Sequence, residues 1–200
     1  MRISGGFAKG RKVGPKRAFA SRGDSDELRP TAAKVRQAIF NIIAGRVEGS
    51  RFLDLYAGTG AVGIEALSRG VGHVVFVEGN ATRIRIIRDL LDRFGFSAQA
   101  SVVKADADSF LKRAPHGSFD IIFLDPPYAT GNLASSLAII DGSRLLKENG
   151  IVIAEHSSKT VLPAFRTLRF RKSYRYGDTA LSLYDYSAYA ESLSTTEGKK

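Results

Sequence analysis

The stretch "RFLDLYAGTGAVGIEALSRG", Arg51 to Gly70, decides the fold of this 200-residue chain. It begins with a short, mostly apolar run typical of a buried strand, and after three glycines it continues with helical spacing of apolar residues. Gly58, Gly60 and Gly63 have the spacing Gly-x-Gly-x-x-Gly, which permits a tight turn and a close approach of backbone to ligand. Strand, glycine turn and helix in this order predict the first unit of a nucleotide-binding α/β fold.

Strand-like and helix-like segments alternate through the rest of the chain. This alternation predicts an α/β protein with a mostly parallel, seven-stranded sheet and helices on both of its faces. The last two strand-like segments lie close together in sequence, so we expect an antiparallel pair there. The expected strands cover 51–58, 73–78, 100–106, 119–125, 150–156, 165–177 and 180–186, and the expected helices cover 29–43, 60–70, 80–95, 107–114 and 132–146.

Composition divides the chain into three parts. We expect a basic N-terminal arm or hairpin over 1–28, one domain over 29–186, and a disordered tail over 187–200. The helix expected at 29–43 has apolar residues at helical spacing, so one face packs on the core. Lys34 and Arg36 are expected on its outer face.

Positive charge is concentrated in two segments. The formal net charge is +10, and residues 1–23 contain seven Lys and Arg and no acid. A second acid-free basic run with interleaved aromatic residues spans Arg166 to Gly177. Segregated charge of this kind predicts contact with nucleic acid, and a solvated, solubilising surface is the alternative.

Several classes of protein are disfavoured. No apolar run approaches the ~20 residues of a membrane span, and the basic N-terminus lacks the apolar region of a secretory signal. The absence of cysteine excludes disulfides and thiolate metal sites and fits a reducing cytoplasm. The three histidines have no metal-binding spacing, and His156 is interpreted as structural rather than as a base. We expect a cytoplasmic monomer with no metal and no membrane contact.

Acidic residues at strand ends indicate which ligand the glycine turn holds. Glu78 lies twenty residues after Gly58, at the end of the next strand, where it can bind ribose hydroxyls; a plain tight turn is the alternative. Asp54 disfavours a pyrophosphate and favours a ligand with an ammonium group, so it favours S-adenosylmethionine over NAD. Asp106 can hold an adenine amino group, cap the next helix, or do both.

A second motif, "FLDPPY" at Phe123 to Tyr128, ends the fourth predicted strand. Its two prolines remove two backbone donors, and they make the segment after the strand rigid and extended where it passes the ligand. There the Asp125 carboxylate and the Pro126 carbonyl can hold both N–H bonds of an exocyclic nucleobase amine, while Tyr128 stacks on the base. The base must then be flipped or unpaired. A rigid turn with a solvated aspartate is the alternative.

Together these motifs resemble those of the bacterial 16S ribosomal RNA guanine-N2 methyltransferases of the RsmD type. The matching stretches are "LDLYAGTGAVGIEALSRG", "FLDPPY" and "YGDTALSLY", with "RISGGFAKGRKV" and "RPTAAKVRQAIFNII" before them. The resemblance runs from about Arg2 to Tyr186. The Asp-Pro-Pro-Tyr box is shared with amino-methylating DNA and protein enzymes, so it indicates the chemistry and not the substrate. Ala32 and Lys34 stand where the family more often has polar or acidic residues.

The resemblance implies a class I, Rossmann-like, S-adenosylmethionine-dependent methyltransferase fold. It implies methylation of one guanine N2 in the head of the small subunit, with 16S rRNA in the 30S subunit or an assembly intermediate as partner and S-adenosylhomocysteine as product. The residues implied for catalysis are Asp125, Pro126, Pro127 and Tyr128. Those expected to bind the cofactor are Asp54, Tyr56, Ala57, Gly58, Thr59, Gly60, Glu78, Gly79, Asp106, Ala107 and Asp125. Those expected to bind RNA are Arg2, Lys9, Arg11, Lys12, Lys16, Arg17 and Arg29.

Three other functions use part of this pattern. A DNA adenine-N6 or cytosine-N4 methyltransferase has the same Asp-Pro-Pro-Tyr box, but it normally needs a target-recognition segment for which 200 residues leave no room. An NAD-dependent oxidoreductase would use the glycine turn and would leave the box unexplained. A nucleic-acid-binding module with a decayed cofactor site would leave the acids at four strand ends unexplained.

Overall fold

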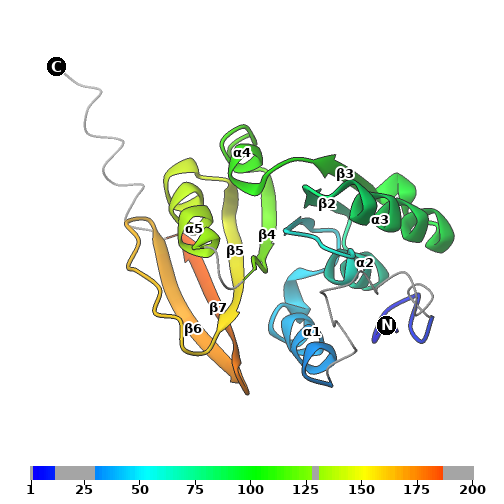
Figure 1. Ribbon diagram of the computed structural model, residues 1–200, viewed down its shortest axis with the longest axis horizontal. Coiled ribbons are helices and arrows are strands. Elements are labelled where there is room, and N and C mark those ends of the chain that lie inside the picture. The colour runs from blue at the N-terminus through cyan, green and yellow to red at the C-terminus, as the bar shows by residue number, and fades with distance from the viewer. Residues whose placement is uncertain (1, 12–29, 128–130, 187–200) are drawn as a thin grey trace.

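Seven strands form one sheet in the computed structural model, which describes residues 2–11, 30–127 and 131–186 (Figure 1). Their order is β3-β2-β1-β4-β5-β7-β6. The pairs among β3, β2, β1, β4 and β5 are parallel, whereas β7 runs antiparallel to both β5 and β6. The predicted α/β fold with an antiparallel C-terminal pair is therefore confirmed. The strands are β1 (Arg51–Leu55), β2 (His73–Glu78), β3 (Ala100–Lys104), β4 (Phe119–Leu124), β5 (Leu146–Ser157), β6 (Leu168–Tyr176) and β7 (Thr179–Tyr186).

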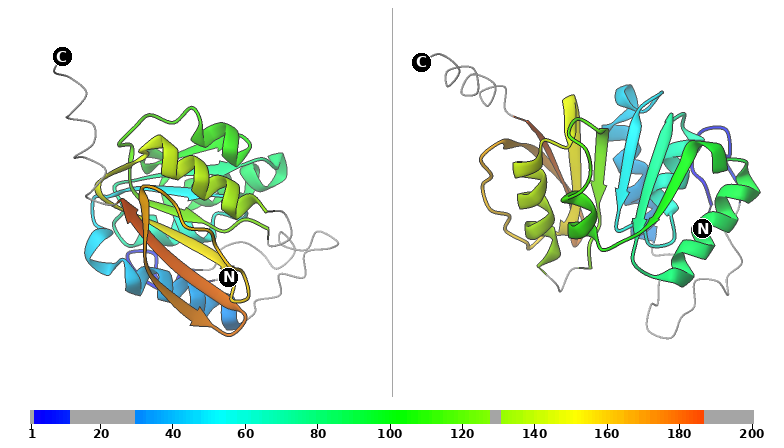
Figure 2. Two further views of the ribbon diagram at one scale, coloured as in Figure 1. Left: turned by 90° about the vertical axis from the view of Figure 1, so that its left-hand side faces the viewer. Right: turned by 90° about the horizontal axis from the view of Figure 1, so that it is seen from above.

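Helices cover both faces of the sheet (Figure 2). On one face α1, α2 and α3 pack against a core that includes Phe52 and Phe123, and on the other α4 and α5 pack against Leu53 and Leu124. Successive residues of β1 and β4 thus enter opposite cores, which explains why these strands are mostly apolar and do not alternate with polar residues. No helix in the described ranges is long and apolar enough to cross a membrane. The helices are α1 (Pro30–Ile42), α2 (Ala61–Ser68), α3 (Ala81–Phe94), α4 (Ala107–Leu111) and α5 (Asn132–Ser143), with short 3-10 turns η2 (Ala44–Arg46) and η3 (Ser97–Gln99).

The boundary between α5 and β5 differs from the expectation. Arg144 has a φ of 47°, in the left-handed region, so α5 ends at Ser143 and not at 146. The chain then joins the sheet at once: β5 begins at Leu146, where a strand was expected only from Gly150. The pairing of β5 with β4 has a shift in register just after Phe119, and this irregularity accommodates the early start.

Residues 2–11 form a short hairpin on the C-terminal end of α2. The N–H of Ile3 donates to the Arg11 carbonyl at 3.1 Å, and the N–H of Gly10 donates to the Ile3 carbonyl at 2.9 Å. The hydroxyl of Ser68 accepts a hydrogen bond from the Ala8 N–H at 2.9 Å and ties the hairpin to the helix. The expected limits of the arm at residue 28 and of the tail at 187 lie outside the described residues and stay predictions.

Arg36 lies on the inner side of α1, so the expectation that it faces outward was wrong. It is only 8% exposed, and its Nη2 donates to the Arg2 carbonyl at 3.2 Å. Its Nε lies 3.6 Å from Oε2 of Glu65, on α2. Because α1 packs against α2 and the hairpin as well as the sheet, its buried arc is wider than one stripe and also includes Phe40. Lys34 is exposed as expected.

Candidate active site

Three acidic side chains lie together at the carboxyl edge of the sheet. Leu55, the last residue of β1, pairs with Leu124, the last residue of β4, and β2 ends beside them. Asp54, Glu78 and Asp125 are therefore neighbours, and burial, followed by the charges of Asp125 and Glu78, raises the pKa of Asp54. This edge therefore carries a cluster of acidic groups around the glycine turn.

The three glycines of the turn are required by its geometry. Gly58 and Gly60 have φ values of 57° and 77°, in the left-handed region that favours glycine. At Gly63, in α2, a Cβ would lie 2.2 Å from the ring of Phe76, so only glycine permits this approach of α2 to β2. The spacing recognised in the sequence thus has a physical cause at each position.

Asp54 is buried beneath this turn. It is 2% exposed, and its Oδ2 accepts a hydrogen bond from the Gly63 N–H at 2.8 Å. Burial, followed by the charges of Asp125 and Glu78, raises the pKa of Asp54 to about 8, although the hydrogen bond from Gly63 opposes this shift. A nearby cation would favour the ionised carboxylate. The site therefore fits a ligand with an ammonium or sulfonium group and disfavours a pyrophosphate.

Glu78 holds the glycine turn from the end of β2. Its Oε2 accepts a hydrogen bond from the Gly58 N–H and its Oε1 one from the Asn80 N–H, both at 2.8 Å. The carboxylate thereby fixes the turn relative to Asn80, the residue that caps α3. Each carboxylate oxygen has a second lone pair, which leaves acceptor capacity for a ribose hydroxyl. Gly79, between the two, lies at the same edge.

Tyr56 joins three segments of this edge through hydrogen bonds. Its φ of 69° is unusual for a residue with a large side chain, and its hydroxyl lies 2.8 Å from the Ser136 hydroxyl of α5. Ser136 donates to Oδ1 of Asp108 in α4 at 2.8 Å, and Ser135 donates to Oδ2 at 2.6 Å. The network connects the elements that follow β1, β3 and β4. Backbone strain held in place by such surroundings is typical of a ligand site.

The other predicted cofactor residues fall on the same edge. Asp106 caps α4, because its Oδ1 accepts a hydrogen bond from the Ser109 N–H at 3.1 Å. This arrangement leaves its proposed contact with adenine as a prediction. Ala107 is buried at the first position of that helix, and the Ala57 N–H donates to a carbonyl of β2 at 2.9 Å. Thr59 lies between the first two glycines of the turn.

The segment after β4 presents a carboxylate at the surface. Asp125 and Pro127 are exposed, whereas Pro126 is buried. Asp125 is nevertheless near enough to influence Asp54 electrostatically. The structure thus brings the exposed acid near Asp54, beneath the glycine turn, and the catalytic role of Asp125 stays a prediction. Tyr128 lies outside the described residues, and its stacking role stays a prediction.

Comparison with known proteins assigns the chain to a family. The model of the family described as Conserved hypothetical protein 95 matches residues 1–185. The chain belongs to this family. It is 37% identical over 187 residues to the putative rRNA methyltransferase YlbH of Bacillus subtilis, with 92% of this chain and 98% of the relative covered. It is 32% identical over 196 residues to ribosomal RNA small subunit methyltransferase D of Escherichia coli K12, with 96% and 93% covered.

Two solved structures similar to this member of the Conserved hypothetical protein 95 family are titled as a putative methyltransferase and a putative methylase. The putative methyltransferase yhhF of Escherichia coli superposes with a TM-score of 0.78 at 28% identity, covering 94% of this chain and 98% of that one. The putative methylase HI0767 of Haemophilus influenzae superposes with a TM-score of 0.74 at 27% identity, covering 92% and 96%. The predicted methyltransferase-type fold is therefore confirmed.

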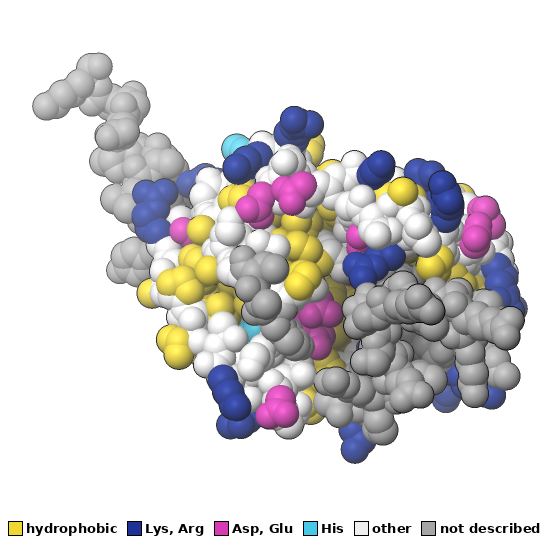
Figure 3. Space-filling model, viewed as in Figure 1, with side chains coloured by type: hydrophobic (Ala, Val, Ile, Leu, Met, Phe, Trp, Pro, Cys, Tyr) yellow, Lys and Arg dark blue, Asp and Glu magenta, His cyan; other side chains and the backbone are white. Residues whose placement is uncertain are grey.

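Basic side chains are exposed on the described part of the N-terminal hairpin of this family member. Figure 3 shows Lys and Arg side chains mostly around the outline of the face viewed, and Asp and Glu side chains both near its middle and at its margin. Arg2, Lys9 and Arg11 are exposed on the N-terminal hairpin, where an RNA contact was predicted. The other residues predicted to contact RNA lie outside the described residues: Lys12, Lys16, Arg17 and Arg29.

The residues that hydrogen-bond around the site from α4, α5 and α2 were not predicted from the sequence. The partners of Tyr56 on α4 and α5 gave no local signal, because they lie far away in sequence. Glu65 did give one: a carboxylate inside the apolar run of α2 is 0% exposed and requires a buried partner. His156 has both ring nitrogens within 2.8 Å of oxygens of Ser157 and Ser182, which fits the structural role assigned to it.

Proposed function

We propose that this protein transfers a methyl group from S-adenosylmethionine to the exocyclic N2 of a guanine in 16S rRNA. The observation that carries the proposal is the exposed Asp125 carboxylate, which precedes two prolines and lies beside the buried acids Asp54 and Glu78. Two relatives named as rRNA methyltransferases, each similar over most of its length, support RNA as the substrate class.

At the carboxyl edge of the sheet, some residues would bind the cofactor and others would bind the guanine. When bound, S-adenosylmethionine would supply an electrophilic methyl group on a sulfonium. The acidic edge around Asp54 and Glu78 would hold the ammonium group and the ribose hydroxyls. The Asp125 carboxylate and the Pro126 carbonyl would each accept a hydrogen bond from one N–H group of the guanine amine. That geometry orients the nitrogen lone pair for in-line attack and stabilises the positive charge that develops on nitrogen.

The basic hairpin supports a nucleic acid partner. Exposed Arg2, Lys9 and Arg11 can each neutralise a phosphate and release a counterion. We propose that the partner is 16S rRNA in the 30S subunit or an assembly intermediate, and that the protein acts there as a cytoplasmic monomer. Tyr128 would stack on the flipped guanine.

Methyl transfer to defined substrates tests the proposed function. The protein is incubated with labelled S-adenosylmethionine and 30S particles that lack the modification, with naked 16S RNA and duplex DNA in parallel, and the labelled nucleoside is identified after digestion. We expect N2-methylguanosine from the particles. Label in DNA alone, or in methyladenosine, would retain the amine chemistry and overturn the ribosomal substrate.

Cofactor binding is expected to release a proton from Asp54. The pKa of Asp54 is raised to about 8, so the folded free protein holds this proton at lower pH. A ligand ammonium favours the ionised form and lowers the pKa, so affinity for S-adenosylhomocysteine should rise as the pH approaches that value. Calorimetry at about pH 6.5 in two buffers of different ionisation enthalpy measures the released proton. Asp54→Asn should remove the buffer dependence, and its persistence in that variant would contradict the assignment.

A further inference from the structure

The outer strand β6 carries a basic and aromatic surface that the proposed reaction does not use. Arg169, Arg171, Lys172 and Arg175 are exposed, and Phe170 is 55% exposed. Asp185 on β7 pairs with Arg169 at 3.2 Å and with Arg171 at 2.6 Å and leaves a net positive strand. Charged residues commonly protect an edge strand from unwanted pairing, but that role does not explain the exposed ring of Phe170 beside them.

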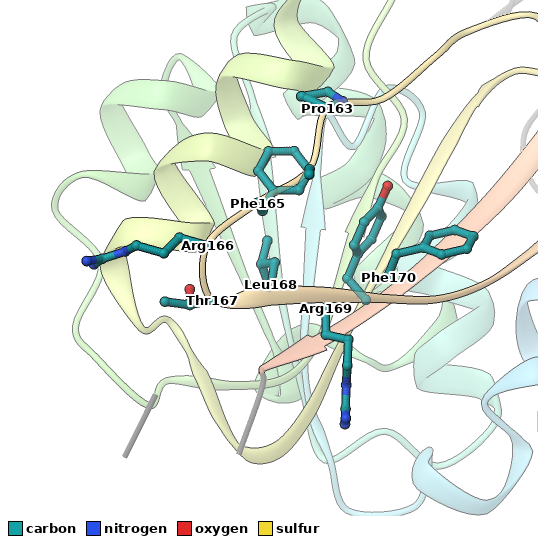
Figure 4. A pocket seen from close by; sticks show the side chains of 9 residues that line it. Pro163, Phe165, Arg166, Thr167, Leu168, Arg169 and Phe170 are labelled. Carbon is teal, nitrogen blue, oxygen red and sulfur yellow. The ribbon is translucent and has the colours of Figure 1, made fainter. Parts of the chain in front are cut away.

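A pocket of about 310 Å³ opens at the beginning of β6 (Figure 4). We call it the β6 pocket; its lining includes Phe165, Arg166, Leu168, Arg169, Phe170 and Tyr184. The rings of Phe165 and Phe170 meet Tyr184 edge-on, with centroid distances of 5.9 Å and 5.7 Å. Figure 4 shows Arg166 and Arg169 extending away from the rings in different directions. Apolar walls with guanidinium groups at the margin therefore define this site.

We propose that the β6 pocket binds an unpaired base of the RNA substrate, with Arg166 and Arg169 at the phosphates on either side. This inference rests on the proposed function, which supplies RNA as the substrate. Aromatic rings stack on any base and basic side chains follow the backbone in single-strand binders, which is the combination present here. The excess of cations along β6 favours RNA over a protein partner.

The register of the sheet separates this site from the candidate active site. Leu124, at the carboxyl edge, pairs with Ala154 of β5. Ala154 pairs with Ser182 of β7, which in turn pairs with Ser173 of β6, so Ser173 marks the level of the carboxyl edge on β6. Among the lining residues on β6, Phe170 is nearest to Ser173, three residues earlier, or roughly 10 Å along the strand at about 3.3 Å per residue. In addition, β6 lies three strands away from β4 across the sheet. A base in the pocket is therefore not the reacting guanine. The pocket should affect RNA affinity and KM, and leave kcat and cofactor affinity unchanged.

Substitutions at Phe170 separate stacking from packing. The probe is a fluorescein-labelled, mixed-sequence, single-stranded RNA of about 12 nucleotides, and the measurement is its Kd by anisotropy. Phe170→Leu keeps apolar bulk without the ring and should weaken binding about tenfold, whereas Phe170→Tyr should retain it. Arg166→Ala should also weaken binding and reduce the salt slope by about one. The matched control is Arg88→Ala on α3, an exposed cation on another element, which should bind as the wild type does.

Two readouts keep this inference distinct from the proposed function. Wild-type affinity in Phe170→Leu, or an equal loss in Arg88→Ala, would overturn the β6 pocket as a base-binding site. Methyl transfer to 30S particles is measured in parallel, and Phe170→Leu should raise KM for the particles with kcat unchanged. If the wild type methylates no RNA, the proposed function fails, while oligonucleotide binding still reports on the pocket. A fall in kcat at saturating RNA would place Phe170 in the chemistry and contradict the separation.

Discussion

Asp125→Asn is expected to reduce kcat for methyl transfer by about 10²–10³-fold, a loss typical of removing one preorganised electrostatic partner of the transition state. The asparagine side chain keeps the size of the original but loses the negative charge that opposes the positive charge developing on nitrogen. Because Asp125 is exposed and follows β4, the fold should be unaffected. Single-turnover transfer to 30S particles, with thermal unfolding in parallel, measures both effects.

Cofactor binding distinguishes this role from a merely structural one. The charge of Asp125 raises the pKa of Asp54, so its removal lowers that pKa and eases ionisation of the buried acid. Affinity for S-adenosylhomocysteine should therefore stay within about threefold of wild type while kcat falls. The matched control is Asp89→Asn, an exposed acid on α3, which should leave both quantities unchanged. Normal turnover in Asp125→Asn would remove this residue from the mechanism.

The parts of the fold that the sequence predicted are those with local physical causes. The glycine turn was recognisable because Gly58 and Gly60 need left-handed backbone and Gly63 needs close packing, and each requirement restricts the residue type. The central strands were recognisable because both of their faces enter a core. The early start of β5 was not, since it follows from the left-handed Arg144 and from a shift in register with a distant strand.

The parts that were missed are tertiary. Arginine is a residue type that usually lies on the exposed face of a helix. Arg36 is buried only because α1 packs against α2 and the hairpin. The hydrogen bond between Tyr56 and Ser136 spans 80 residues, so no window of sequence contains both partners. The acids at the strand ends were found from sequence because a parallel sheet brings all carboxyl ends to one edge. That rule places residues at an edge, and it does not say which of them are buried.

Glu65→Ala is expected to destabilise the protein by about 3–5 kcal/mol, because it leaves a buried charge without its partner. The Glu65 side chain is 1% exposed and lies 2.9 Å from Nε of Arg69 and 3.6 Å from Nε of Arg36. It also accepts hydrogen bonds from the N–H and the hydroxyl of Ser4, at 2.8 Å and 2.7 Å. Urea unfolding measures the loss, and Glu148→Ala, an exposed carboxylate, should stay within about 0.5 kcal/mol of wild type.

The same carboxylate should decide whether the N-terminal hairpin stays docked. Ser4 belongs to the hairpin and Arg36 to α1, so Glu65 is the group in α2 that holds both. In Glu65→Ala, trypsin should cleave after Lys9 and Arg11 much faster than in wild type, under conditions where the domain remains folded. Pairing the change with Arg36→Met should recover part of the stability, since the more deeply buried of the two cations is then removed and Arg69 is partly exposed. The hairpin should remain sensitive because Ser4 has still lost its acceptor. Protection equal to wild type in Glu65→Ala would show that the hydrogen bonds of Ser68 and the apolar contacts of Ile3 and Ala8 suffice to hold the hairpin, and that the buried carboxylate serves only α1 and α2.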